Sequence, residues 1–190
     1  MRARTGSAAA IAALIMAVVP VVAHGSDDAP VRADCSTRSE ADFPGAYKRA
    51  ENLVVGPLAM IGAGGDTSAA TVERFGGNKF PVLVRAGHTV TISVPNTIRA
   101  TASLGYGPLP QGQVSARDGH GTVTFVACRQ DQPSQSRADG PVTFWSGFVF
   151  ATQPSCVPLD VYVDAAKTAQ RVGLSLGRHC TKSEIHGPPR

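Results

Sequence analysis

The stretch HTVTISV, residues 88–94, indicates the fold class of this chain. Apolar β-branched residues alternate in it with threonine and serine, and residues 98–104 repeat the alternation with Ile98 and Leu104 at the ends. A period of two is typical of antiparallel strands that bury one face. Because Pro95 and Asn96 lie between the two runs, we expect them to form a turn and the runs to form a hairpin.

Further short segments have strand character, and glycine- or proline-rich pieces separate most of them. Only residues 67–74 suggest helix, of a turn or two. About eight short strands separated by such glycine- and proline-rich segments predict a single antiparallel β-sandwich, Greek-key or immunoglobulin-like, over residues 43–180. The remaining strand candidates are residues 53–61, 80–85, 122–128, 143–150, 159–163 and 171–176.

The first 23 residues are predicted to be a signal peptide. Arg2 and Arg4 precede an apolar run, residues 8–22, which ends in small residues. The run is shorter than the roughly 20 residues that span a bilayer, so we expect cleavage and no membrane span afterwards. An uncleaved anchor is the alternative, and it leaves the same secreted, extracytoplasmic domain outside. Residues 24–42 and 181–190 are predicted to be a flexible lead-in and a flexible tail.

The charge of the chain argues against nucleic acid as a partner. The formal net charge is +4, and loss of Arg2 and Arg4 with the leader lowers it by two, to +2. The remaining basic residues are scattered and form no run. A nucleic-acid-binding surface needs a basic cluster, so no such partner is expected.

Four cysteines in an exported chain predict two disulfides. No C-x-x-C pair is present, so a zinc site is not expected, and three connectivities are possible in principle. Pairing Leu159 with Leu176 places the apolar residues of both strands on one face. Extending that ladder brings Cys156 within one residue of Cys180, a gap that a bend at Gly177 can close. The predicted pairs are Cys156–Cys180 and Cys35–Cys128.

The segment FWSGFVF, residues 144–150, carries the most distinctive side chains. Its phenylalanines suit the core, which leaves Trp145 and Val149 on the other face. An exposed tryptophan could stack on a sugar ring or anchor a partner, and Tyr162 could extend that surface. The alternative is that this strand is central and that long connections cover Trp145.

Catalytic motifs are scarce. Neither G-x-S-x-G nor H-E-x-x-H occurs. The string DGHG, residues 118–121, brings Asp118 close to His120, which suits acid–base chemistry or a metal, with His88 as a possible third member. The alternative is an ordinary Asp-Gly turn before a strand. We expect no cofactor and no metal.

Four strings carry a resemblance to a known group of proteins: FPVLVRAGH (80–88), VTFVAC (123–128), FWSGF (144–148) and CVPLDV (156–161). Together they resemble small secreted β-domain proteins of actinobacterial type. The resemblance covers roughly residues 80–180. It implies the fold and the compartment and brings no activity or binding residues with it.

These observations predict an exported, disulfide-stabilised β domain that acts as a non-catalytic cell-surface or cell-wall binding or accessory module. Its partner would be a cell-envelope polymer or a surface protein. The alternative is a secreted hydrolase-type enzyme with a composite site around His88, Asp118 and His120. A third reading is that the domain requires a partner chain to cover an apolar outer face.

Overall fold

The computed structural model describes residues 30–132 and 136–186. Within these residues, thirteen strands form three sheets, with few helices. The β-rich class and the two disulfides agree with the prediction, but the single eight-strand sandwich is wrong. The signal-peptide segment lies outside the described residues.

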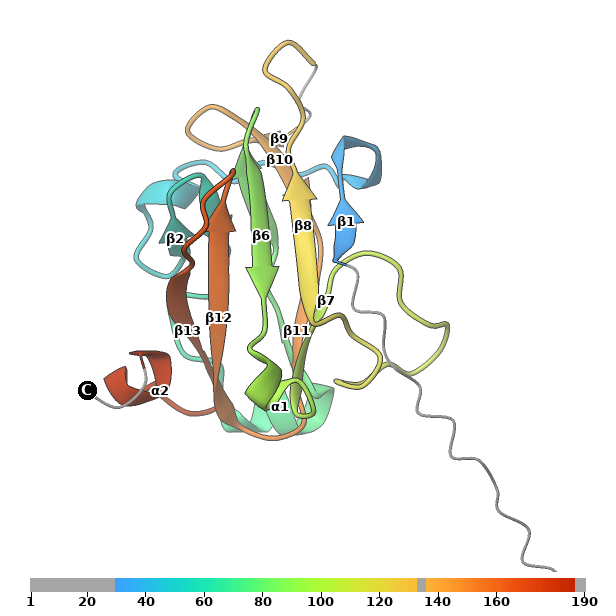
Figure 1. The fold of residues 1–190 in the computed structure, drawn as a ribbon, viewed down its shortest axis with the longest axis vertical. Helices are drawn as coiled ribbons and strands as arrows, with labels where there is room; N and C mark the ends of the chain where they lie inside the picture. The colour runs from blue at the N-terminus through green and yellow to red at the C-terminus, as the bar shows by residue number, and fades with distance from the viewer. Residues whose placement is uncertain (1–29, 133–135, 187–190) are drawn as a thin grey trace, which may run out of the picture.

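The first sheet has five strands, and Figure 1 shows it facing the viewer. The edge strand β1 is parallel to β8, while the other neighbours are antiparallel. Strand β1 lies within residues 24–42, the predicted lead-in. The order is β1 (Val31–Ala33), β8 (Thr122–Val126), β6 (Thr89–Ser93), β12 (Ser155–Val163) and β13 (Gln170–Leu176).

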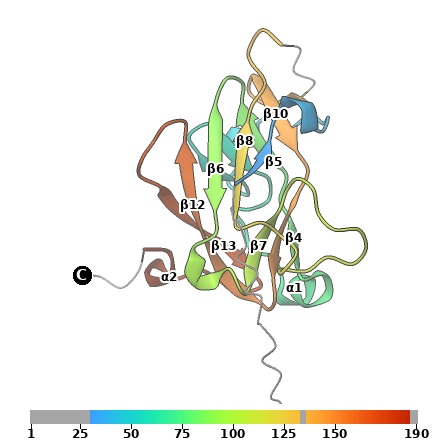
Figure 2. The same cartoon turned by 45° about the vertical axis from the view of Figure 1, so that its right-hand side comes forward.

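The other two sheets are seen behind the first in Figure 2. The second has the order β2 (Leu53–Val55), β3 (Leu58–Met60), β5 (Val82–Arg85), β10 (Pro141–Trp145) and β9 (Ser136–Arg137). The third has the order β4 (Gly77–Lys79), β11 (Phe148–Ala151) and β7 (Ala102–Gly105). Three 3-10 turns cover Cys35–Thr37, Ala46–Lys48 and Asn96–Ile98.

The expected short helix is present as α1, Ala69–Phe75. Ser68 caps it by accepting a hydrogen bond from the N–H of Thr71, and Gly76 ends it with a φ of +67°. A second short helix, α2 (Lys182–His186), lies within residues 181–190, the predicted tail.

The predicted hairpin of residues 88–104 does not form. Strand β6 pairs with β8 and β12, whereas β7 pairs with β11 in another sheet. The intervening residues form the 3-10 turn Asn96–Ile98 in place of a hairpin turn. Alternation determines which face of a strand is buried, but it does not select the neighbouring strand.

Two predicted strands are each divided into two. Residues 53–61 become β2 and β3, because Gly56, with a φ of +53°, makes a tight turn with Pro57. Residues 143–150 become β10 and β11, which belong to different sheets. The chain passes between these sheets at Ser146 and Gly147.

The last hairpin has the predicted faces in a different register. Leu159 pairs with Val172, and Leu176 pairs with Ser155, four residues from the expected alignment. An even shift keeps every side chain on its face. Beyond the ladder, Gly177 adopts a φ of +79°, and Cys180 returns to bond Cys156. Both predicted disulfides are present.

Candidate functional site

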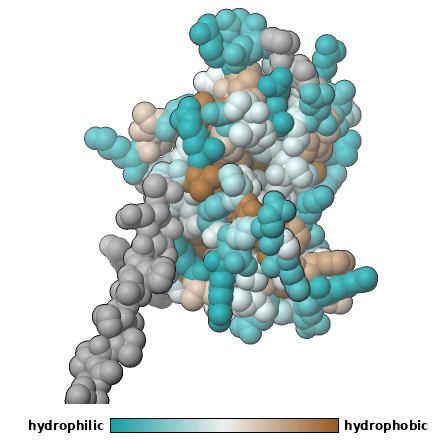
Figure 3. All heavy atoms as spheres, turned by 90° about the vertical axis from the view of Figure 1, so that its right-hand side faces the viewer, coloured by the Kyte–Doolittle hydropathy of each residue, from teal (hydrophilic) through white to brown (hydrophobic). Residues whose placement is uncertain are grey.

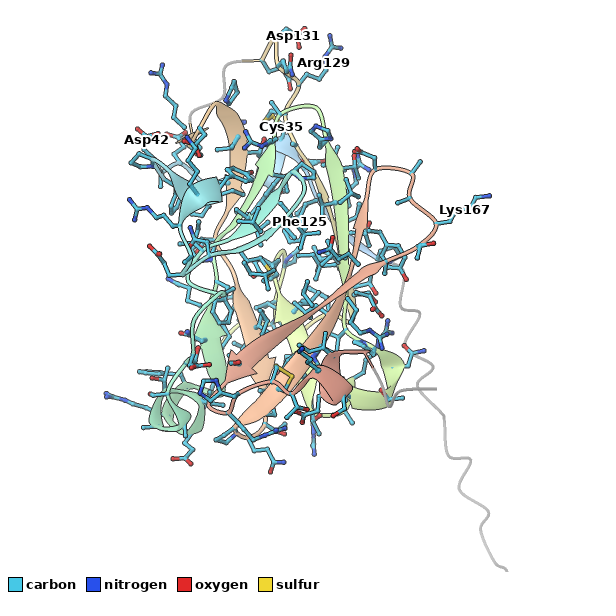
Figure 4. The ribbon with its side chains drawn as sticks, turned by 90° about the vertical axis from the view of Figure 1, so that its left-hand side faces the viewer. Cys35, Asp42, Phe125, Arg129, Asp131 and Lys167 are labelled. Atoms are coloured by element: carbon cyan, nitrogen blue, oxygen red, sulfur yellow. A yellow bond between two sulfur atoms is a disulfide. The ribbon has the colours of Figure 1, made fainter. Side chains whose placement is uncertain are left out.

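The predicted aromatic surface is wrong, because Trp145 is enclosed. Its side chain is 3% exposed, its ring lies 5.3 Å from that of Phe125, and its indole N–H donates to the carbonyl of Asp34 at 3.1 Å. Val149 is fully buried. Figure 4 labels Phe125 in the interior of the molecule. The alternative, a strand covered on both sides, is therefore the one that the structure bears out.

Tyr162 does not extend a surface around Trp145. It lies half-buried on β12 in the first sheet, opposite Thr91, whereas Trp145 belongs to the second sheet. The phenylalanines are also distributed differently from the prediction. Phe144 joins a small cluster on the outer side of the second sheet, where its ring meets that of Phe43 at 4.9 Å.

His88, Asp118 and His120 do not form a composite site. The Nδ1 of His88 lies 3.0 Å from the Asp164 carboxylate, and the Nε2 of His120 lies 2.9 Å from the carbonyl of Pro108. Because β6 and β8 are antiparallel, His88 and His120 lie at opposite ends of the sheet, about 20 Å apart at ~3.3 Å per residue. The hydrolase hypothesis based on these residues is wrong. No metal-binding group of three or more His, Cys, Asp or Glu occurs among the described residues.

A groove of about 300 Å³ lies on the outer side of the second sheet. We call it the Phe43 groove. Its lining combines apolar side chains with three charged ones and a buried amide. The lining residues are Asp42, Phe43, Pro44, Ala46, Arg49, Glu51, Asn52, Ile61 and Gly62.

Asn52 joins the two walls of the Phe43 groove. It is 8% exposed, donates from Nδ2 to the carbonyl of Ala46 at 2.8 Å, and accepts from the N–H of Gly62 at 2.8 Å. The ring of Phe43 packs edge-on against the ring of Phe144. A buried amide that is hydrogen-bonded through both its nitrogen and its oxygen, together with a packed aromatic ring, makes the shape of the groove largely preformed.

Charges of both signs lie around the Phe43 groove. Arg49 and Glu51 form an ion pair with a 3.7 Å separation, and both side chains are more than half exposed. The Asp42 carboxylate accepts a hydrogen bond from the N–H of Arg137 at 2.9 Å. Figure 4 labels Asp42 at the upper left of the molecule. Such a lining suits a ligand with many hydroxyls better than a strongly charged one.

Sequence reasoning missed this groove because its residues have neither a period nor a motif. Asp42 falls at the end of the predicted lead-in, and the following residues form turns. A larger cavity of about 390 Å³ is lined by residues between Gln130 and Pro141, on both sides of residues 133–135, which are outside the described residues.

No protein-family model, curated protein or solved structure matches this chain. Two disulfides are typical of proteins in an oxidising, extracytoplasmic compartment. Of the helices in the described residues, none has the length and apolar character needed to cross a membrane.

Proposed function

We propose that this chain is an exported, non-catalytic recognition module that binds one saccharide unit of a cell-envelope polymer in the Phe43 groove. The single observation that carries the proposal is the lining of that groove, where an aromatic ring and Ile61 lie beside two carboxylates and a guanidinium. A sugar ring offers an apolar C–H face and a rim of hydroxyls, and this lining complements both.

The size of the groove supports a single sugar unit. At about 300 Å³ it lies at the lower end of the range for small-molecule sites. Carboxylates of Asp42 and Glu51 accept hydrogen bonds from hydroxyls, and Arg49 donates them. With both signs present, the groove does not favour a ligand of high net charge.

Export is supported by the predicted signal peptide at residues 1–23 and by the two disulfides. The resemblance of residues 80–180 to small secreted proteins of actinobacterial type supports the same compartment. The Phe43 groove lies outside that region, so the resemblance adds nothing about the ligand.

The test is co-sedimentation of the mature domain with insoluble, protein-free cell-wall glycan. We expect saturable binding that weakens about tenfold or more in Phe43→Ala, which removes the apolar platform. Glu51→Gln changes an exposed carboxylate without disturbing the core and should weaken binding as well. Phe75→Ala is the matched control, because Phe75 is 57% exposed on α1 and does not line the groove.

The proposal fails if the unmodified domain stays in the supernatant, or if Phe43→Ala and Glu51→Gln sediment as well as Phe75→Ala. Binding to envelope protein in place of the glycan would also overturn it, in favour of a surface-protein partner.

A further inference from the structure

A smaller cavity, of about 150 Å³, lies where the long connection between β7 and β8 returns to the end of β7. We call it the arginine pocket. It shares no lining residue with the Phe43 groove. Figure 3 shows the face that carries this connection, where hydrophilic side chains project beside small apolar areas. Its lining includes Arg99, Ser103, Ala116, Arg117, Gly119 and Gly121.

Ser103 gives the pocket an unused polar group. The residue is 3% exposed, and its Oγ has no hydrogen-bond partner within residues 30–132 and 136–186. Buried hydroxyls are normally bonded, because leaving one unpaired costs free energy. A Cβ on Gly119 would lie 2.2 Å from this Oγ, so a side chain at position 119 would cover the hydroxyl.

The guanidinium of Arg99 is held in place at the pocket. Its Nε donates to the carbonyl of Val94 at 3.1 Å, and its Nη2 donates to Thr122 Oγ1 at 3.2 Å. It lies against Gly121, where a Cβ would be 2.6 Å from Cζ. A cation fixed in this way is preorganised, so little rotamer freedom is lost when an anion binds.

Arg117 supplies a second cation from the returning connection, which is itself anchored. Leu104 and His120 exchange two backbone hydrogen bonds of 2.8 Å. The neighbouring Asp118 carboxylate is occupied by Ser115, whose N–H and hydroxyl donate to it at 2.8 and 2.7 Å. These hydrogen bonds hold the pKa of Asp118 below its usual value. Among the residues that the structure describes, the pocket thus brings two guanidinium groups together, and the carboxylate of Asp118 is bound to Ser115.

We infer that the arginine pocket binds a single oxyanion group, a phosphate, sulfate or carboxylate. The Ser103 hydroxyl would donate one hydrogen bond, and Arg99 and Arg117 would supply the compensating charge. Arginine forks match all three anions in geometry. A volume of about 150 Å³ equals that of roughly five water molecules, which accommodates such a group.

The test is a two-dimensional ¹H–¹⁵N NMR titration of the whole mature domain with inorganic phosphate, at constant ionic strength against chloride. Sulfate and acetate form separate arms. We expect saturable shifts of the Gly119 and Gly121 amide signals with at least one of them. If the domain binds phosphate or sulfate more tightly than acetate, the natural ligand group is a phosphate or sulfate. If it binds acetate more tightly, the natural ligand group is a carboxylate.

Two variants separate binding from structure. Arg117→Ala and Ser103→Ala should each weaken anion binding by about 10- to 100-fold, the cost of one charge-assisted hydrogen bond. Ser103→Ala should leave the anion-free domain as stable as before or more stable, since it removes an unpaired buried hydroxyl. Arg129→Ala is the control, because Arg129 pairs with Asp131 near the far end of the molecule (Figure 4).

The inference is overturned if none of the three anions produces saturable shifts beyond those in chloride. Unchanged affinity in Ser103→Ala and Arg117→Ala would overturn it equally. Phe43→Ala should leave the anion titration unchanged, so failure of the glycan proposal and failure of this one are distinguishable.

Discussion

Tyr106 provides the sharpest test of how burial sets the value of a hydrogen bond in this fold. The residue is 1% exposed, and its hydroxyl donates to the carbonyl of Phe80 at 2.6 Å. Its ring meets that of Phe125 edge-on at 5.2 Å. A Cβ on Gly147 would lie only 2.0 Å from the ring, so the ring has no room to move on that side.

Tyr106→Phe removes one oxygen and keeps the ring. The buried carbonyl of Phe80 then loses this donor, and water has no direct access to it, so we expect a loss of about 1–3 kcal/mol in the free energy of unfolding. Tyr47→Phe is the matched comparison, because the Tyr47 hydroxyl also donates to a backbone carbonyl, that of Pro57, at 2.8 Å.

The Tyr47 substitution should cost less, about 0.5–1 kcal/mol. Tyr47 is only half-buried, and the Pro57 carbonyl keeps a second hydrogen bond from the N–H of Arg85 at 3.0 Å. The assay is urea unfolding of the unmodified domain and both variants at pH 7 with the disulfides intact. The free energies of unfolding are compared provided that the m-values of the three proteins agree. Equal losses, or a larger loss in Tyr47→Phe, would refute the reasoning that burial raises the cost and that the second donor at Pro57 lowers it.

Two further predictions concern the disulfides and alkaline pH. Replacing Cys35 and Cys128 by alanine should lower the free energy of unfolding by about 4–5 kcal/mol, and replacing Cys156 and Cys180 should lower it by about 3–4 kcal/mol. The first loss is larger because the first disulfide closes a loop of 93 residues and the second a loop of 24. The reverse order in urea unfolding would contradict the loop-entropy argument. Burial raises the pKa of Tyr106 and of Tyr47 above the ordinary value of 10, so the folded chain retains protons that the unfolded chain releases. These two groups should therefore leave the free energy of unfolding constant below about pH 10 and lower it above that pH by up to ~1.4 kcal/mol per pH unit per tyrosine. In Tyr106→Phe the contribution of Tyr106 to this decrease should be absent. A urea midpoint that stays flat from pH 9 to 11 would exclude this explanation.

The positions of most strands could be predicted from the sequence. Alternating residues around Val90 and Leu174 identify buried faces, and these faces survive even where the register differs by four residues. The pairing of Cys156 with Cys180 was also predictable, because a hairpin is a local structure and its strands are close in sequence. The other pair followed from it by elimination.

Strand partners were not predictable from the same pattern. Residues 88–94 and 98–104 look like a hairpin, yet they enter different sheets, because the edges of β6 are occupied by β8 and β12. Competition for a strand edge depends on segments distant in the chain. Local alternation contains no information about that competition.

The sequence by itself determined the β class, the buried faces of alternating strands such as β6 and β13, and the cysteine pairing, since each depends on side-chain period or on short-range geometry. Only the tertiary structure decided that Trp145 is enclosed, because its cover includes Asp34, 111 positions away in the chain. It also decided where binding sites lie. The Phe43 groove and the arginine pocket are assembled from turns and connections whose residues have no period, so their chemistry exists only once the strands have placed them together.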